Sequence, residues 1–142
     1  MHTPEEAQRT FPIRLLKPRH AILAGEPCVS IMILMRPFLW NGEVVDTSIR
    51  LDGIELPSTH LNELIGKSFA FPISPEDGYI NGSIYLESKH HPVDVTELSF
   101  PLARDGGLSV IVKGIYKFEH EGLCGLPDTP FTFGVRVSSC AI

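Results

Sequence analysis

Residues 108–119 read LSVIVKGIYKFE, and their alternation of apolar and polar side chains decides the fold. The apolar set is Leu108, Val110, Val112, Tyr116 and Phe118, and the polar set is Ser109, Lys113, Lys117 and Glu119. Successive side chains of a strand point to opposite faces, so this period of two predicts a strand with one buried face. Gly114 falls on the buried face, which predicts that another chain segment approaches the backbone closely there.

The chain around this stretch repeats the same short pattern. In 130–137 the residues Phe131, Phe133, Val135 and Val137 alternate with polar ones. Further apolar stretches at 67–71, 79–86 and 93–100 are separated by Gly, Pro, Asp and Asn, the residues that form turns. In the last of them the apolar phase slips, which predicts a β-bulge near Thr96-Glu97.

The first half of the chain predicts a long hairpin. Both alternating sets of residues 28–35 are largely apolar, which is typical of a central strand covered on both faces. Asn41-Gly42 is the strongest turn signal, because both residue types tolerate the positive φ of a type I′ turn. It should fold 28–40 back onto 43–51. Phe11–Leu16 predicts an edge strand, since Pro12 and Pro18 cannot donate to a ladder.

One short helix is predicted at 58–65. Ser58 or Thr59 would be its N-cap, and Gly66 is placed to end it. Its apolar face, made by Leu61, Leu64 and Ile65, should cover an open end of the core. Residues 1–10 are polar, and we expect a loose N-terminal arm there.

About eight short strands without intervening helices predict an all-β fold, either an antiparallel β-sandwich or a partly closed barrel. With 142 residues, 43% of them apolar and 20% charged, the chain fits a single domain over 1–142. The formal net charge of -5 argues against nucleic-acid binding, which requires a basic surface, and favours a basic partner.

The expected location is the cytoplasm, away from membranes. The N-terminal MHTPEE has acids where a secretion signal has bases, and no apolar run is long enough to span a bilayer. Cys28, Cys124 and Cys140 are an odd number without a CxxC pair, so they indicate neither a disulfide framework nor a zinc cluster.

The segment KHHPVD, residues 89–94, is the most suggestive cluster of candidate metal ligands in the sequence. His90, His91 and Asp94 could serve a metal-dependent β-barrel enzyme, with His60 or His120 as further ligands. Adjacent residues of a strand point to opposite faces, however, so the two imidazoles cannot enter one site without a bend. A solvent-facing turn is the favoured interpretation. We expect no cofactor and, since no nucleophile elbow or phosphate loop occurs, no enzyme.

Aromatic and apolar side chains beside turns are the candidate partner-binding residues. Because aromatic anchors within an acidic rim suit a basic protein partner, the candidates are Phe38, Leu39, Trp40 and Tyr79 with the acids Glu43, Asp46 and Glu76. Alternatively, Phe38 and Trp40 cap the end of the core.

Three segments, GSIYL at 82–86, HPVDV at 91–95 and FEHEGL at 118–123, resemble small β-rich bacterial immunity proteins. The resemblance implies a cytoplasmic, non-enzymatic protein that neutralises one cognate toxin by tight binding. The acidity of the chain suits a basic toxin. A metal-dependent enzyme and a structural subunit of a larger assembly are the alternatives, and the oligomeric state stays open.

Overall fold

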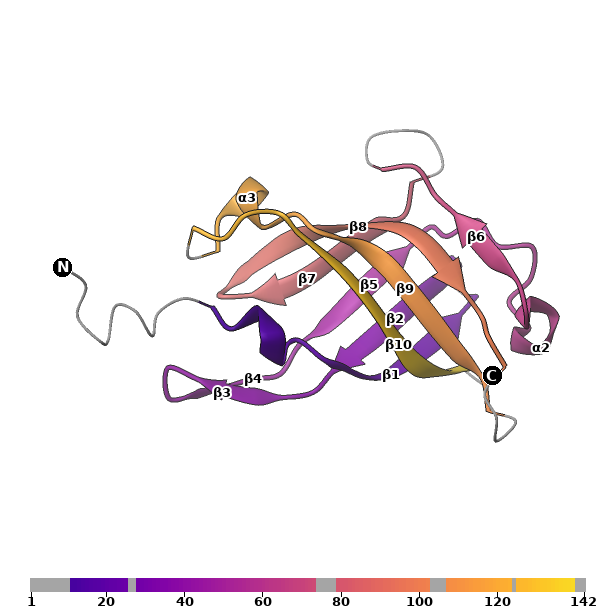
Figure 1. Ribbon diagram of the computed structural model, residues 1–142, viewed down its shortest axis with the longest axis horizontal. Coiled ribbons are helices and arrows are strands. Elements are labelled where there is room, and N and C mark those ends of the chain that lie inside the picture. Colours follow the sequence, from indigo (N-terminus) through magenta and orange to yellow (C-terminus); the bar gives the residue numbers. More distant parts are fainter. Residues whose placement is uncertain (1–10, 26–27, 74–78, 103–106, 124, 140–142) are drawn as a thin grey trace.

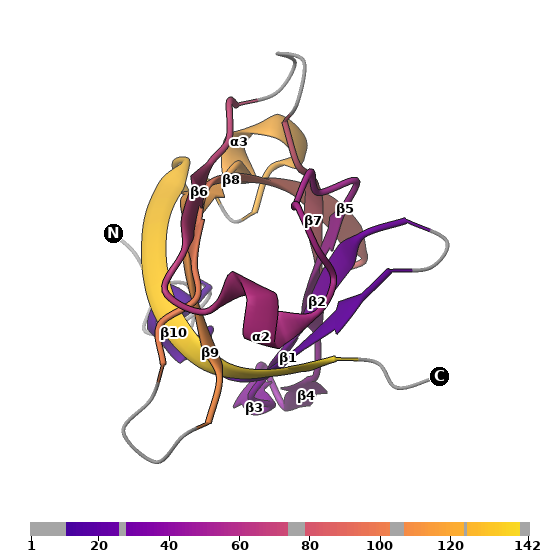
Figure 2. The ribbon, with the colours of Figure 1, turned by 90° about the vertical axis from the view of Figure 1, so that its right-hand side faces the viewer.

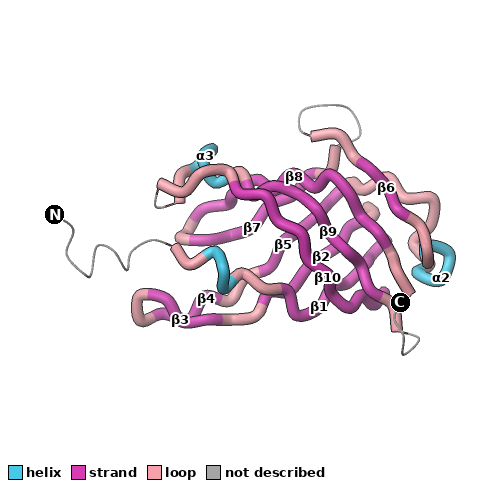
Figure 3. The backbone as a smooth tube through the Cα atoms, in the orientation of Figure 1, coloured by secondary structure: helices cyan, strands magenta, loops and turns pink. Residues whose placement is uncertain are grey.

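A computed structural model describes residues 11–25, 28–73, 79–102, 107–123 and 125–139, and it shows a β-barrel (Figure 1). Seven strands close into the barrel, one extra strand pairs at its edge, and two more form a separate hairpin. The all-β prediction is confirmed, and of the two predicted architectures the barrel is the one observed. Helix is confined to short segments, as Figure 3 shows.

The elements follow one another in an order without long helical crossovers. The helices are η1 (Ile13–Leu15, a 3₁₀ turn), α2 (Leu61–Leu64) and α3 (Phe118–Glu121). The strands are β1 (Pro18–Ala24), β2 (Ser30–Met35), β3 (Phe38–Trp40), β4 (Glu43–Val45), β5 (Ser48–Asp52), β6 (Ser68–Ala70), β7 (Asn81–Leu86), β8 (Lys89–Ser99), β9 (Ser109–Tyr116) and β10 (Thr129–Ser139). None of the helices in these ranges is long and apolar enough to cross a membrane.

The barrel contains one parallel pair, which the sequence did not predict. Its order is β8-β7-β5-β2-β1-β10-β9, and pairing between β8 and β9 closes the ring. All neighbours are antiparallel except β1 and β10. An odd number of strands cannot close with every neighbour antiparallel. The seven-strand ring therefore requires a parallel pair, and β1–β10 supplies it.

The interior is filled by the apolar faces of the strands. Val110, Val112 and Tyr116 of β9 are buried, and so are Ile49 and Leu51 of β5. Small barrels are normally packed in this way rather than open.

β2 departs from the expectation of two covered faces. Ile31, Ile33 and Met35 are buried inside the barrel, whereas Met32 and Leu34 are half-buried on its outside. The difference arises because, in the described ranges, no second sheet packs over the outer face of β2.

Two predicted irregularities are confirmed. The pairing of β8 with β9 shifts its register between Val95 and Glu97, where the β-bulge was expected. At Gly114 an added Cβ would collide with the backbone oxygen of Asp94 on β8 and would lie 3.1 Å from Cζ of Phe131. Gly114 is thus required by a close approach of neighbouring strands.

The predicted hairpin is also confirmed, in two parts. β2 pairs with β5 from Ser30↔Asp52 to Leu34↔Ser48. Beyond Pro37, which cannot donate to a ladder, pairing resumes between β3 and β4. Asn41 and Gly42 form the turn with φ of 53° and 76°, as a type I′ turn requires. This outer part, the β3–β4 hairpin, extends from the barrel wall (Figure 1).

Several boundaries differ from the prediction: β1 was not predicted, and β8 begins at Lys89 rather than at Val93. Residues 11–16 are not an edge strand but contain η1, because Pro12 fixes φ and its carbonyl accepts a 2.9 Å hydrogen bond from the amide of Leu15. α2 is one turn long, with His60 rather than Ser58 or Thr59 at its N-cap. The strand predicted to reach Glu119 ends at Tyr116, and α3 follows.

Two of the short helices contribute a buried side chain to the core. α2 lies across one end, where Leu64 is fully buried (Figure 2). α3 places Phe118 in the core, against the rings of Tyr116 and His91. The role predicted for the helix at 58–65 is therefore confirmed, although its length is not.

Candidate protein-binding site

The two faces of the β3–β4 hairpin have different surroundings. Phe38 and Trp40 are half-buried and make edge-on contacts with the buried ring of Phe11, at centroid distances of 5.8 and 4.9 Å. Leu39 and Val44 lie opposite each other on the other face and are 71% and 66% exposed. Leu39 and Val44, rather than the aromatic pair, are the apolar side chains most available to a partner.

The other predicted partner-binding residues are only partly brought together. Glu43 and Asp46 are exposed on and just after β4. Tyr79 precedes the start of β7, so the length of that strand separates it from the end that approaches the hairpin. Glu76 lies outside the described residues.

An open hollow of about 310 Å³ lies between β4 and the tip of the β7–β8 hairpin. Residues 43–47 line one side of it and residues 85–88 the other. A second hollow of about 210 Å³ adjoins it and shares Asp46, Thr47 and Tyr85. Tyr85, which is 49% exposed, therefore borders both hollows, and its ring lies 4.8 Å from that of His90.

The first hollow is acidic. Glu43, Asp46 and Glu87 line it, and among the described residues no lysine or arginine does. Arg50 lines the second hollow only. An incoming basic side chain would thus meet carboxylates beside an accessible aromatic ring, which is a favourable setting for a cation.

The tip of the β7–β8 hairpin is held in an unusual backbone conformation. Glu87 and Ser88 have φ of 54° and 64°, a region that side-chain-bearing residues seldom adopt. The last two backbone oxygens of β7, just before this turn, each accept a hydrogen bond from a side chain. Thr47 Oγ1 donates to the Tyr85 oxygen at 2.7 Å, and the Leu86 oxygen accepts from His91 Nε2 at 3.1 Å.

The solvent-facing turn that was favoured for residues 89–94 is wrong, because these residues belong to β8. The two imidazoles point in opposite directions, as expected for adjacent residues of a strand. His90 is exposed beside Tyr85, whereas His91 is fully buried against Phe118. His91 Nδ1 has no hydrogen-bond partner among the described residues. Asp94 is largely buried. Within the described ranges, no three His, Cys, Asp or Glu side chains are grouped so that they could hold a metal ion.

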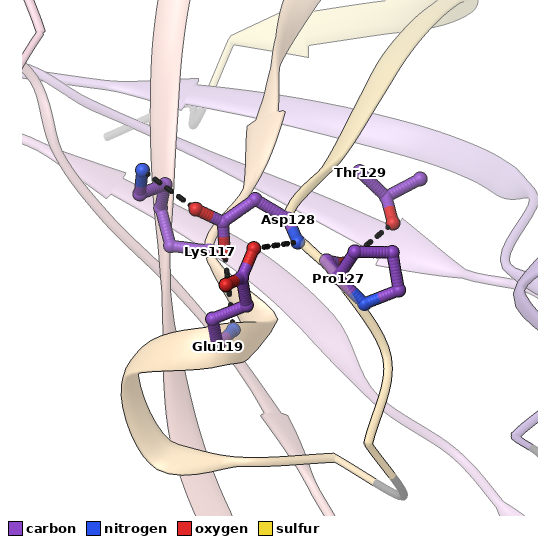
Figure 4. Close-up of polar contacts among 5 residues, drawn as sticks. All are labelled: Lys117, Glu119, Pro127, Asp128 and Thr129. Carbon is purple, nitrogen blue, oxygen red and sulfur yellow. Dashed lines mark hydrogen bonds and ion pairs between the residues drawn. The ribbon is translucent and has the colours of Figure 1, made fainter.

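A separate polar cluster closes the loop that contains α3 (Figure 4). Lys117 Nζ lies 2.8 Å from Asp128 Oδ2, and the Glu119 amide donates to Asp128 Oδ1 at 3.0 Å. The Asp128 amide donates in return to Glu119 Oε2 at 2.9 Å. The Lys117 hydrogen bond first, and the Glu119 amide second, lower the pKa of Asp128. These groups satisfy one another, which fits a structural role.

Sequence reasoning missed Val44, Tyr85 and Glu87. The available signal was the alternation of 81–86, which puts Tyr85 on the outward set with Asn81 and Ser83. The pairing of β5 with β7 brings this strand next to the hairpin, and no local pattern reports such a neighbour.

No protein-family model, no curated protein and no solved structure matches this chain.

Proposed function

We propose that this protein is a non-enzymatic binding protein that recognises a basic protein partner. The binding region is the Tyr85 surface, which we define as Leu39, Glu43, Val44, Asp46, Tyr85 and Glu87. The observation that carries the proposal is that exposed Val44 and Tyr85 line one hollow together with three carboxylates, while exposed Leu39 lies opposite Val44 on the same hairpin face. Such a combination offers apolar area for affinity and charge for orientation and partner choice.

The packing of the barrel supports binding on the outside. Ile33, Ile49 and Val112 are fully buried and belong to one continuous core. The two hollows at the Tyr85 surface lie on the exterior, at the end of the barrel where the β3–β4 and β7–β8 hairpins project. A macromolecular partner fits such open hollows better than a small molecule, which is usually enclosed by its site.

The narrower form of the proposal is a cytoplasmic immunity protein that neutralises a cognate basic toxin. It rests on the resemblance of segments 82–86, 91–95 and 118–123, the first of which includes Tyr85. Co-expression tests this form. The protein should protect cells from the toxicity of the captured partner, and a partner that is harmless to cells would remove the immunity role while leaving binding in place.

Charge reversal tests the binding proposal. Partners captured from the source organism are identified, purified and titrated against the wild type, Asp46→Lys and Glu63→Lys. Glu63→Lys is the matched control, because Glu63 is an exposed acid on α2 at another place on the barrel. We expect a basic partner whose affinity falls with Asp46→Lys and with added salt, but not with Glu63→Lys. Equal effects of the two reversals, or an acidic partner, would contradict the proposal.

A further inference from the structure

We propose that the partner binds by strand addition, with an extended basic segment pairing along the free edge of β4 inside the first hollow. This inference rests on the proposed function and specifies how the Tyr85 surface is used. Strand addition is a general mode of recognition in which backbone hydrogen bonds supply affinity and alternate side chains supply specificity.

The register of the hairpin shows which backbone groups are available. β4 pairs with β3, and with no other strand in the part of the chain that the structure describes. Trp40 and Glu43 flank the two-residue turn, so they exchange hydrogen bonds, and the alternation of an antiparallel ladder then leaves Leu39 and Val44 as a non-hydrogen-bonded pair. Val44 therefore directs its N–H and C=O away from β3.

The first hollow lies where the pairing of β5 with β7 ends, beside the free edge of β4. β5 pairs with β7 from Asp52↔Asn81 to Ile49↔Ile84, and beyond that point the Thr47 hydroxyl donates to the Tyr85 oxygen across the two strands. β4 continues the path of β5, while Glu87 and Ser88 continue the path of β7 beyond its last residues, Tyr85 and Leu86. The hollow is bounded by these two continuations. A strand from a partner would occupy the gap in the sheet that their divergence leaves.

The side chains of β4 suit an attached strand. Free edges are commonly protected by lysine, proline, a bulge or short length. β4, Glu43-Val44-Val45, is short but has no lysine, proline or bulge. A residue added opposite Val44 would share its face with Leu39 and should be apolar. Its neighbours would project on the face of Glu43, where lysine or arginine would be favoured, while Asp46 and Glu87 add to the negative field of the hollow.

An octapeptide of alternating lysine and valine, capped at both ends, is the probe. Amide exchange of the labelled protein is followed by NMR as the peptide is added. We expect slower exchange at the amide of Val44 and shifts at Tyr85, whereas a peptide with glutamate in place of lysine should not bind. Absence of binding by the lysine peptide, or binding without protection of the Val44 amide, would overturn the inference.

Two substitutions of Val44 distinguish the contribution of its backbone N–H to binding from that of its side chain. Val44→Pro removes the outward N–H, and Val44→Ala removes only side-chain atoms. We expect Val44→Pro to bind the lysine peptide and the captured partner about tenfold more weakly than Val44→Ala, the amount expected for losing a backbone hydrogen bond. Trp40, the single tryptophan, packs on Phe11, so its fluorescence checks that the hairpin stays folded in both variants.

The outcomes test strand addition separately from the proposed binding of a basic partner. Equal affinity of the two Val44 variants for a partner whose binding still depends on Asp46 would overturn strand addition and leave the binding function standing. Insensitivity of that partner to Asp46→Lys would remove both. Self-association through β4, seen as Val44→Pro converting a dimer to a monomer in light scattering, would assign the edge to a second copy and overturn the inference.

Discussion

The hydroxyl of Thr47 donates a 2.7 Å hydrogen bond to the backbone oxygen of Tyr85. This bond joins the corner before β5 to the end of β7, at the point where the two hairpins diverge and the first hollow begins. We expect Thr47→Val to lower the free energy of unfolding by about 1 kcal/mol, because the Tyr85 oxygen loses its donor. Thr47→Ser keeps a hydroxyl and should lose less. Chemical denaturation measures both, and equal losses would show that the bond contributes little.

Replacing Ser88 should stabilise the protein. Ser88 has a φ of 64°, and glycine adopts this conformation without the cost that a side chain carries. We expect Ser88→Gly to raise the free energy of unfolding by about 1 kcal/mol, measured by urea denaturation. The reciprocal control is Gly42→Ala in the other hairpin turn, where φ is 76° and an added Cβ meets no atom within 4 Å. It should destabilise by a similar amount, and effects of the same sign at the two positions would refute the strain argument.

Gly114→Ala should destabilise the barrel by roughly 1–3 kcal/mol, the usual cost of overpacking. The added methyl would collide with the backbone of β8, which cannot move aside as a flexible side chain could. Gly134→Ala on the neighbouring strand β10 is the matched control, because its methyl would lie 3.8 Å from Ile111 Cγ1, an ordinary contact. Thermal unfolding of the two variants should differ clearly, and similar melting temperatures would argue against the close approach of β8 and β9.

The pKa of Asp128 should be below its ordinary value and should rise in Lys117→Met. The lysine hydrogen bond is the main cause of the lowering, and the Glu119 amide remains in that variant, so the rise should be partial. A lowered folded-state pKa contributes stability above the unfolded value of about 4, and this contribution is lost as the pH falls through the folded value. NMR titration measures the pKa. Lys113→Met removes a lysine of β9 that is not among the causes of the lowered pKa, and an equal rise in that variant would contradict the assigned cause.

Local alternation was enough to predict most of the strands. These predictions depend only on neighbours along the chain or on one packed face. They include the alternation in 108–119 and 130–137, the Asn41-Gly42 turn, the bulge near Thr96 and the close approach at Gly114. The parallel β1–β10 pair depends on how many strands close the ring, which no local pattern contains. The helical turn at 118–121 was missed because its apolar residue, Phe118, continues the strand phase while packing into the core from α3.

The candidate site was predictable only in part. Leu39, Glu43 and Asp46 flank a recognisable turn, so sequence could point to them. Trp40 was an expected anchor, and its half-burial depends on Phe11, a residue from a segment predicted to be a strand. Tyr85 and Glu87 join the site only through the pairing of β5 with β7. Long-range pairing thus assembles the hollow, and the sequence alone could not show it.

The most direct test of the account compares two tyrosines on one scaffold. Tyr85, at the centre of the proposed surface, and Tyr79, before the other end of β7, are 49% and 36% exposed. Each is replaced by alanine, and affinity for the captured basic partner is measured by titration calorimetry. We expect Tyr85→Ala to weaken binding about 30-fold or more, the loss expected for an interface hot spot, while Tyr79→Ala binds as the wild type does. Equal affinities of the two variants, or a larger loss for Tyr79→Ala, would contradict it.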